Sequence, residues 1–263
     1  MSEAIRSDSS QVRAPKGRVS RATRRRSKVS HLVASEIVRD IVEMGLKEGD
    51  QLPNESAMLE EFDVGRASLR EALRMLESFG LIAIKQGQKG GPVVAAIDPV
   101  DLARSLSFYF HMTGATYGDL IEARLIIEPV MARLAAERQD EEQMKQLREV
   151  IEREQEAPLD EPVYVARANE FHYMVSGMSG NHVLDLIGRS LRALYQEGTR
   201  SGALLPPETR PVARELHKEI SEAIIGGDGE LAQSLMARHL ERLADAQFEQ
   251  TPNLKDQRVT WLG

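Results

Sequence analysis

Residues 52–81 read LPNESAMLEEFDVGRASLREALRMLESFGL, and this stretch decides how the N-terminal part of the chain folds. The pattern predicts a short helix over 55–62, a tight turn at 63–65 and a second helix over 66–79. Asn54 is suited to cap the first helix, because its side-chain oxygen can accept an unpaired backbone N–H. Gly80 is a typical helix end. The stretch therefore predicts two short helices joined by a tight turn.

The second of these helices has two different faces. Its apolar residues recur at spacings of four, three and three, which marks one buried face: Leu69, Leu73, Leu76 and Phe79. The N-terminal part of the other face carries Arg66, Ser68 and Arg70, with Arg74 further on. A helix fits the DNA major groove, where arginine binds guanine O6 and N7 through two hydrogen bonds. An ordinary helical hairpin with a solvated basic face is the alternative.

A β-hairpin with a glycine-rich tip is predicted directly after this helix. Two β-like runs, Leu81–Lys85 and Pro92–Ala96, flank a basic tip that contains Gln86, Gly87, Lys89 and Gly91. Glycine lets the backbone approach phosphates or the minor groove closely, and Lys89 adds positive charge. Two strands behind a helix-turn-helix make a wing.

The motifs over residues 28–96 resemble the winged helix of the GntR family of bacterial transcription regulators. The resemblance is carried by LKEGDQLPNE, by LEEFDVGRASLREALRMLESFGLI and by the glycine-rich wing. It implies DNA contacts by Arg66, Ser68 and Arg70, and by the wing residues Gln86, Gly87, Lys89 and Gly91. One departure is Ser56, because the family usually has arginine at this position. The operator of this protein is therefore expected to differ.

The helix that should pack behind the recognition helix is predicted over Ser30–Met44, with Gly45 at its end. One face is formed by Leu32 or Val33, by Ile37, Ile41 and Met44. This helix, the helical hairpin and the wing together make a predicted DNA-binding domain over residues 28–97.

Charge is distributed unevenly along the 263 residues. The net charge is −7, but residues 1–28 contain nine Lys or Arg and two acids, which leaves −14 for the remainder. A basic end on an acidic body is typical of DNA binding at one end only. We predict a disordered arm over residues 1–27 that adds phosphate contacts, or a solvated tail. A transit peptide is disfavoured by Glu3, Asp8 and Pro15.

The cysteine content and the length of the apolar runs limit the class of protein further. The chain has no cysteine, so a reducing cytoplasm is its simplest location. No apolar run approaches the length of a membrane span.

From Asp98 onward the sequence predicts only helices, an all-α bundle of six or seven helices over residues 98–250. Asp98 followed by Pro99 is a strong helix start. The expected helices span about 99–111, 117–138, 140–155, 161–177, 182–199, 208–226 and 229–249. Residues 251–263 form a tail without a clear period, which is either loose or docked on a partner subunit. A winged helix followed by such a bundle resembles the FadR-type branch of the GntR family, whose FCD domain binds an effector and dimerises.

Three histidines of the bundle form a candidate metal site. His217 and His239 each lie eleven residues from Asp228 in the predicted turn between two helices, so an antiparallel pair places them at one level. His172 precedes a break on another helix. Three imidazoles suit Zn²⁺ or a similar divalent ion, whereas three unrelated histidines are the alternative. The resemblance favours the metal, because FCD domains typically bind one through three histidines.

The fourth ligand expected from the resemblance is altered. FCD domains typically have Asp four residues before the first histidine, and Ala168 occupies that position. Asn169 lies three residues before His172 and can reach the same helical face as a neutral, weaker ligand. The site is therefore expected to be completed by Asn169 or by an anionic effector.

An effector carboxylate is expected at Arg124, which lies on a helix whose other residues point inward. An arginine in that place needs an anion, and guanidinium pairs with carboxylate in a bidentate way. The anion is either the effector, as the resemblance implies, or Glu128 one turn further on. Tyr195 is predicted to line the same cavity.

The function predicted is that of a sequence-specific DNA-binding transcription regulator, a homodimer on a pseudo-palindromic operator whose affinity is controlled by a small carboxylate effector, with or without a bridging metal. The sequence leaves repression and activation open. One alternative is a regulator of the same fold that binds no metal and senses a fatty acyl ligand, which Ala168 in place of the usual acid and the apolar segment Leu102–Phe110 leave open. A distant alternative is a metal-dependent enzyme, disfavoured because no nucleophile or phosphate-binding motif is found.

Overall fold

The structure is a computed structural model that describes residues 21–87, 90–159, 163–198 and 207–262. The chain divides between Ile97 and Asp98 into an N-terminal and a C-terminal unit, each with its own core. Among the described helices, none is both long enough and apolar enough to cross a membrane.

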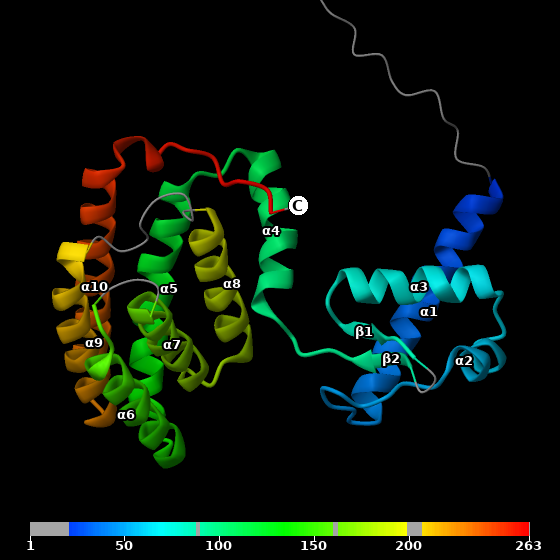
Figure 1. The fold of residues 1–263 in the computed structure, drawn as a ribbon, viewed down its shortest axis with the longest axis horizontal. Helices are drawn as coiled ribbons and strands as arrows, with labels where there is room; N and C mark the ends of the chain where they lie inside the picture. The colour runs from blue at the N-terminus through cyan, green and yellow to red at the C-terminus, as the bar shows by residue number, and fades with distance from the viewer. Residues whose placement is uncertain (1–20, 88–89, 160–162, 199–206, 263) are drawn as a thin grey trace, which may run out of the picture. The chain divides into compact units, whose positions relative to one another are not determined.

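The N-terminal unit is a winged helix-turn-helix (Figure 1). Its elements are α1 (Arg21–Glu43), α2 (Glu55–Glu61), α3 (Arg66–Ser78), β1 (Ile82–Lys85) and β2 (Gly91–Val94). Helix α3 packs against α1, α2 and β1. The core at their junction includes Ile37, Met58, Leu69, Leu76 and Ile82, all nearly inaccessible to solvent. This confirms the predicted order of helix, helical hairpin and wing.

Backbone conformation explains the sharp turns of this unit. Asn54 caps α2 as predicted, because its Oδ1 accepts a hydrogen bond of 3.0 Å from the backbone N–H of Ala57. Asp63 adopts a left-handed conformation (φ +46°) in the turn before α3, a conformation that Asp tolerates better than most residues. Gly80 (φ +69°) ends the helical path after α3.

Strands β1 and β2 pair antiparallel, with Ile82 opposite Val94 and Lys85 opposite Gly91. The tip requires glycine, because a side chain at Gly90 would collide with the carbonyl oxygens of Lys85 and Gly87. An isolated bridge from Gln51 to Val93 holds the wing against the segment before α2. Glycine at the tip thus lets two short strands reverse direction tightly.

Helix α1 is longer than predicted, since it begins at Arg21 rather than Ser30. The prediction relied on an apolar stripe, but Arg, Lys and Ala extend a helix without one. The arm predicted over 1–27 is therefore helical from Arg21 onward, and residues 1–20 lie outside the described residues.

Two apolar residues placed on buried faces are in fact exposed. Met44 is 64% exposed because it follows the last residue of α1, and Phe79 is 56% exposed because it is the C-terminal cap of α3. Val33, and not Leu32, is the residue of α1 that packs inward. The helical spacing of apolar residues therefore predicts burial only for residues within the helix itself.

The C-terminal unit is an all-α bundle, as predicted (Figure 1). Its helices are α4 (Pro99–Thr113), α5 (Tyr117–Arg138), α6 (Glu141–Glu156), α7 (Val163–Met178), α8 (His182–Gly198), α9 (Arg210–Ile225) and α10 (Gly229–Gln250), with short 3₁₀ turns η1 (Pro207–Thr209) and η2 (Pro252–Leu254). Helix α5 contacts α7, α8, α9 and α10 and is thus the centre of the bundle.

Side-chain caps set the starts of these helices. Asp98 accepts a hydrogen bond from the N–H of Val100, and Pro99 occupies the first turn of α4. Thr116 and Asp119 form a reciprocal capping box at the start of α5. Asp228 caps α10 directly after the turn from α9, so these two helices run antiparallel. The caps fix where each helix enters the bundle.

The tail is docked on its own bundle over residues 251–262. Arg258 forms a β-bridge with Thr116, and Val259 is fully buried. The N–H of Val259 donates to the carbonyl of Ala115, and its own carbonyl lies 3.0 Å from His111 Nδ1. The sequence predicted a tail that is either loose or docked on a partner subunit. In the structure the tail instead packs against its own bundle, at the corner between α4 and α5.

Candidate nucleic-acid interface and candidate metal centre

Helix α3 presents its polar face to solvent. Arg66 and Arg70 are exposed and Ser68 is half-buried, whereas Leu69 and Leu73 on the opposite side are buried. The predicted separation of a core face from a basic face is therefore present. The exposed guanidinium groups are free to reach an approaching duplex.

Arg70 is held in place by a neighbouring helix. Its Nε lies 2.8 Å from Glu55 Oε1 and its Nη2 lies 3.4 Å from Oε2, so the pair is bidentate. The hydrogen bond and charge of Glu55 raise the pKa of Arg70. Because both side chains are exposed, the pair contributes little to stability. Glu55 instead orients the Arg70 side chain on the exposed face of α3.

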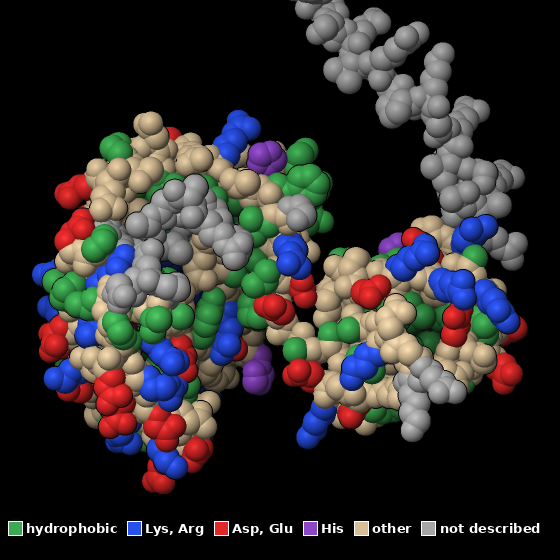
Figure 2. All heavy atoms as spheres, in the orientation of Figure 1, with side chains coloured by type: hydrophobic (Ala, Val, Ile, Leu, Met, Phe, Trp, Pro, Cys, Tyr) green, Lys and Arg blue, Asp and Glu red, His purple; other side chains and the backbone are tan. Residues whose placement is uncertain are grey.

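A basic groove runs between α1 and α3. Arg26 and His31 of α1 line it together with Arg66, Arg70 and Arg74 of α3, and Glu71 is the acid among them. Figure 2 shows Lys and Arg side chains gathered over this part of the unit. Positive charge beside a recognition helix suits a phosphate backbone.

The wing residues predicted to contact DNA are partly described. Gln86 and Gly87 are exposed at the end of β1, and Gly91 is half-buried at the start of β2. Lys89 lies outside the described residues.

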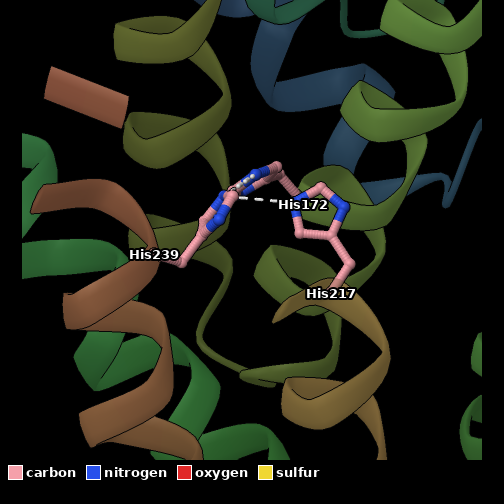
Figure 3. Close-up of side chains that lie close together, drawn as sticks. All are labelled: His172, His217 and His239. Carbon is pink, nitrogen blue, oxygen red and sulfur yellow. Dashed lines mark hydrogen bonds between the residues drawn. The ribbon is translucent and has the colours of Figure 1, made fainter. Parts of the chain in front are cut away.

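The three predicted histidines converge in the bundle, although they come from α7, α9 and α10 (Figure 3). His239 Nε2 lies 3.1 Å from His217 Nε2 and 3.2 Å from His172 Nε2. All three side chains are buried. The equal distances from Asp228 thus place His217 and His239 at the same level, as expected for an antiparallel pair.

Two carboxylates orient two of the three rings. His172 Nδ1 lies 2.7 Å from Glu128 Oε2, and His217 Nδ1 lies 2.8 Å from Glu154 Oε1. A carboxylate accepts hydrogen bonds, so each Nδ1 carries a proton, and each Nε2 is the ring nitrogen that faces His239. Such carboxylate–histidine pairs are typical around metal ligands. Sequence reasoning missed Glu154, which lies on α6, far from the histidines in the chain.

The third ring differs from the other two. His239 Nδ1 is buried and has no hydrogen-bond partner among the described residues. Burial, aided by the nearby His217 and His172, lowers the pKa of His239, and burial likewise lowers that of His172. These two rings are therefore neutral near pH 7, and neutral imidazole is the form that binds metal.

The arrangement fits a divalent ion. For Zn–N bonds of about 2.0–2.1 Å, tetrahedral geometry separates ligand nitrogens by roughly 3.4 Å, close to the two measured separations. Three neutral nitrogens leave a fourth position for an oxygen ligand. The donor set therefore suits Zn²⁺ or a similar ion.

A buried ionic network adjoins the histidines. Arg124 Nε donates to Glu128 Oε1 over 2.6 Å, so the internal salt bridge weighed from the sequence is present. Burial alone would raise the pKa of Glu128, but Arg124, His172 and Arg192 together hold it well below its usual range. Glu128 is thus a carboxylate shared between a cationic and a histidine neighbour.

Asn169 faces an arginine that sequence reasoning missed. Its Oδ1 accepts hydrogen bonds from Arg192 Nε (3.1 Å) and Nη2 (2.6 Å), so both of its lone pairs are engaged. A metal ion could gain this oxygen only by displacing Arg192. The available signal was an arginine inside the apolar run Leu191–Tyr195 of α8.

A cavity joins these groups. The charged, aromatic and amide side chains that line it are Arg124, Asn169, His172, Arg192, Tyr195, Gln196, His217, His239 and Gln247. Tyr195 was predicted to line this cavity, and the guanidinium of Arg124 lies 4.9 Å from the centre of its ring. Ala168, at the position where related domains have Asp, also lines the wall. The predicted metal and effector residues thus surround one space.

The two units define the class of the protein. A winged helix-turn-helix with an exposed basic recognition helix, joined to a helical bundle around a largely apolar cavity with a few charged groups in its wall, is a DNA-binding regulator with a ligand-binding domain.

Comparison with known proteins identifies the family. Residues 30–89 match the family "Bacterial regulatory proteins, gntR family", and residues 119–242 match "FCD domain". The HTH-type transcriptional regulator LutR of Bacillus subtilis is 29% identical over 76% of this chain and 92% of its own length. The HTH-type transcriptional repressor NanR of an Enterobacter strain is 30% identical over 63% of this chain and 65% of its own. The chain belongs to the GntR family of transcription regulators and carries an FCD domain.

A solved structure agrees with this assignment. Streptococcus agalactiae GntR superimposes with a TM-score of 0.63 and 25% identity, covering 82% of this chain and 99% of that one. The resemblance stated from the sequence is confirmed. Since the families and relatives are transcription regulators, the metal-dependent enzyme is not favoured.

Proposed function

We propose that this regulator is a homodimeric, cytoplasmic repressor whose affinity for its operator is set by a small carboxylate bound in the cavity of the bundle. The observation that carries the proposal is the meeting of three buried histidine nitrogens and two buried arginines around one cavity. The relative named NanR is a transcriptional repressor, which supports the direction of control.

DNA recognition is assigned to α3 and the wing. Arg66, Ser68 and Arg70 read base edges in the major groove, because they occupy the exposed N-terminal half of α3. Gln86, Gly87, Lys89 and Gly91 of the wing contact the backbone or the minor groove. Two copies bind the two halves of a pseudo-palindromic operator.

His172, His217 and His239 hold the divalent ion, with Glu128 and Glu154 fixing the orientation of two rings. When bound, an ion such as Zn²⁺ supplies a positive charge and an open position for a ligand oxygen. Asn169 remains a candidate fourth ligand only if Arg192 releases it.

Control follows from where the ligand binds. The cavity is lined by α5, α7, α8, α9 and α10, so a ligand in it contacts helices from every part of the bundle. A ligand that favours one arrangement of these helices changes the DNA affinity through the dimer. A coupling free energy of about 1–3 kcal/mol corresponds to roughly a 5- to 150-fold change.

The fatty acyl alternative is less well supported. Of its two grounds, the segment Leu102–Phe110 contributes no residue to the described lining of the cavity, whereas Ala168 does line it. Two arginines and three histidines also suit an acidic headgroup better than a long hydrocarbon chain.

The experiment measures DNA affinity by fluorescence anisotropy on a duplex enriched from a random library by the wild-type protein. Arg66→Ala is expected to weaken binding by about 1–3 kcal/mol, the cost of losing one bidentate base contact. Arg39→Ala, an exposed arginine of α1 that pairs with Glu36, is the matched control. Equal affinity of wild type and Arg66→Ala would refute the recognition-helix assignment. A light-scattering mass of one chain would refute the homodimer.

A further inference from the structure

The cavity contains more positive than negative charge. The described residues that line it include two arginines, Arg124 and Arg192, and no carboxylate. Glu128 lies behind the wall and is the nearest acid to both guanidinium groups. One carboxylate therefore serves two buried cations.

Glu128 compensates the two arginines unequally. It lies 2.6 Å from Arg124 Nε but 4.0 Å from Arg192 Nη1, and its second oxygen also accepts the hydrogen bond of His172. Arg192 otherwise donates to the neutral amide oxygen of Asn169. Consistent with this, burial and the nearby Arg124 lower the pKa of Arg192 to about 10, whereas Glu128 keeps that of Arg124 raised. Arg192 is still a cation at pH 7, and its charge is incompletely neutralised.

A second donor on the same helix also lacks an acceptor. Gln196 is one turn after Arg192 on α8, and both line the cavity. Gln196 Nε2 is buried and has no hydrogen-bond partner among the described residues. Its Oε1 accepts a long hydrogen bond of 3.4 Å from the hydroxyl of Tyr173. Buried donors are normally paired, so an unpaired one beside a cation indicates an absent acceptor.

We infer that Arg192 and Gln196 form the subsite that receives the anionic oxygen atoms of the effector, so that its carboxylate binds at α8 rather than at Arg124. Arg124 is already engaged by Glu128 and instead positions that carboxylate against His172. The inference rests on the proposed function, because it assigns a residue to the carboxylate proposed there.

The test follows the thermal midpoint of the full-length protein in the presence of millimolar acetate, succinate, malate or gluconate. At least one acid is expected to raise the midpoint of the wild type. Arg192→Met keeps the length of the side chain and removes its charge, so it should abolish this shift. Titration calorimetry with the most effective acid should then give an affinity lower by about tenfold or more, the usual effect of losing a charged hydrogen bond.

Arg189→Met is the matched control on the same helix. Arg189 pairs with Asp185 at 2.5 Å and does not line the cavity, so its variant should keep the ligand-induced shift. Arg192→Lys should recover part of the shift, since charge returns without the planar fork.

The outcomes distinguish a failure of the Arg192–Gln196 subsite from a failure of the proposed carboxylate effector. If Arg192→Met retains the shift while its metal content equals that of the wild type, the subsite is wrong and a carboxylate effector remains. If no acid shifts the wild type, the carboxylate effector fails and the subsite fails with it.

Discussion

At the scale of single residues, Glu154 and Arg192 are the parts of the site that sequence reasoning did not find. The spacing around Asp228 placed His217 and His239 at one level, because helix geometry is regular. Glu154 and Arg192 reach the same cavity from α6 and α8, and their approach depends on how those helices pack. A pattern within one helix therefore predicts ligands, but their supporting partners require the fold.

We expect Glu154→Gln to weaken metal binding about 10- to 100-fold, since partners behind metal ligands typically contribute that much. Gln keeps a hydrogen-bond acceptor for His217 Nδ1 and removes only the charge. Competition with a chromogenic chelator measures the affinity. Glu152→Gln, at an exposed position of α6, is the control and should bind metal as the wild type does. Identical affinities of all three proteins would remove Glu154 from the site.

At the scale of elements, α3 has two faces with different roles. One face packs in the core, and the other carries the residues proposed to bind DNA. Leu69 is fully buried and Phe79 is 56% exposed, although both belong to the same predicted apolar stripe. The position of a residue relative to the helix end decides which of these environments it meets.

Leu69→Ala should destabilise the N-terminal unit by about 2–5 kcal/mol through the cavity it leaves. Phe79→Ala, at an exposed cap, should change stability by only about 0.5 kcal/mol or less. Hydrogen exchange of the α3 amides measures the difference locally. Faster exchange in Phe79→Ala than in Leu69→Ala would contradict the observed burial.

The docked tail makes a second prediction at this scale. Val259 is fully buried at the corner of α4 and α5, so Val259→Asp places an unpaired charge there and should lower the melting temperature of the bundle. The neighbouring side chain of Thr260 is exposed, and Thr260→Asp should leave the melting temperature nearly unchanged. Calorimetry compares the two, and an equal loss in both would mean that the tail is not docked in solution.

The tail and α1 also show why parts of the fold escaped prediction. Helix periodicity and caps located most helices within a few residues. Residues 251–262 have no period, and their order comes from backbone hydrogen bonds to Ala115, Tyr117 and Gly118. The first turns of α1 lack an apolar stripe. Hydrogen bonds between backbone atoms that lie far apart in the sequence leave no pattern in the order of residue types, so the sequence alone does not reveal them.

At the scale of the whole molecule, charge is divided between the two ends of the chain. The basic N-terminal end makes DNA affinity sensitive to salt, whereas the acidic remainder disfavours contact with DNA elsewhere. Arg26, which lines the groove beside α3, belongs to the basic N-terminal end, which is expected to attract the phosphates of DNA.

Arg26→Ala is expected to flatten the plot of log affinity against log salt by about 0.9, the slope for one phosphate contact. The preference among operator sequences should stay unchanged, because a phosphate contact carries no base information. Anisotropy titrations at several salt concentrations measure both quantities. Lys145→Ala, in the C-terminal unit, is the control. A changed sequence preference with an unchanged slope would place Arg26 at a base instead.

The sharing of Glu128 has a further consequence for what the bundle senses. This one carboxylate contacts His172 on the metal side and lies 4.0 Å from Arg192 Nη1 on the anion side, so occupancy of either side alters the electrostatic field felt by the other. Linkage makes such an influence mutual and equal in free energy. The cavity would then respond fully only when both metal and metabolite are available. A low concentration of either one would weaken the response to the other.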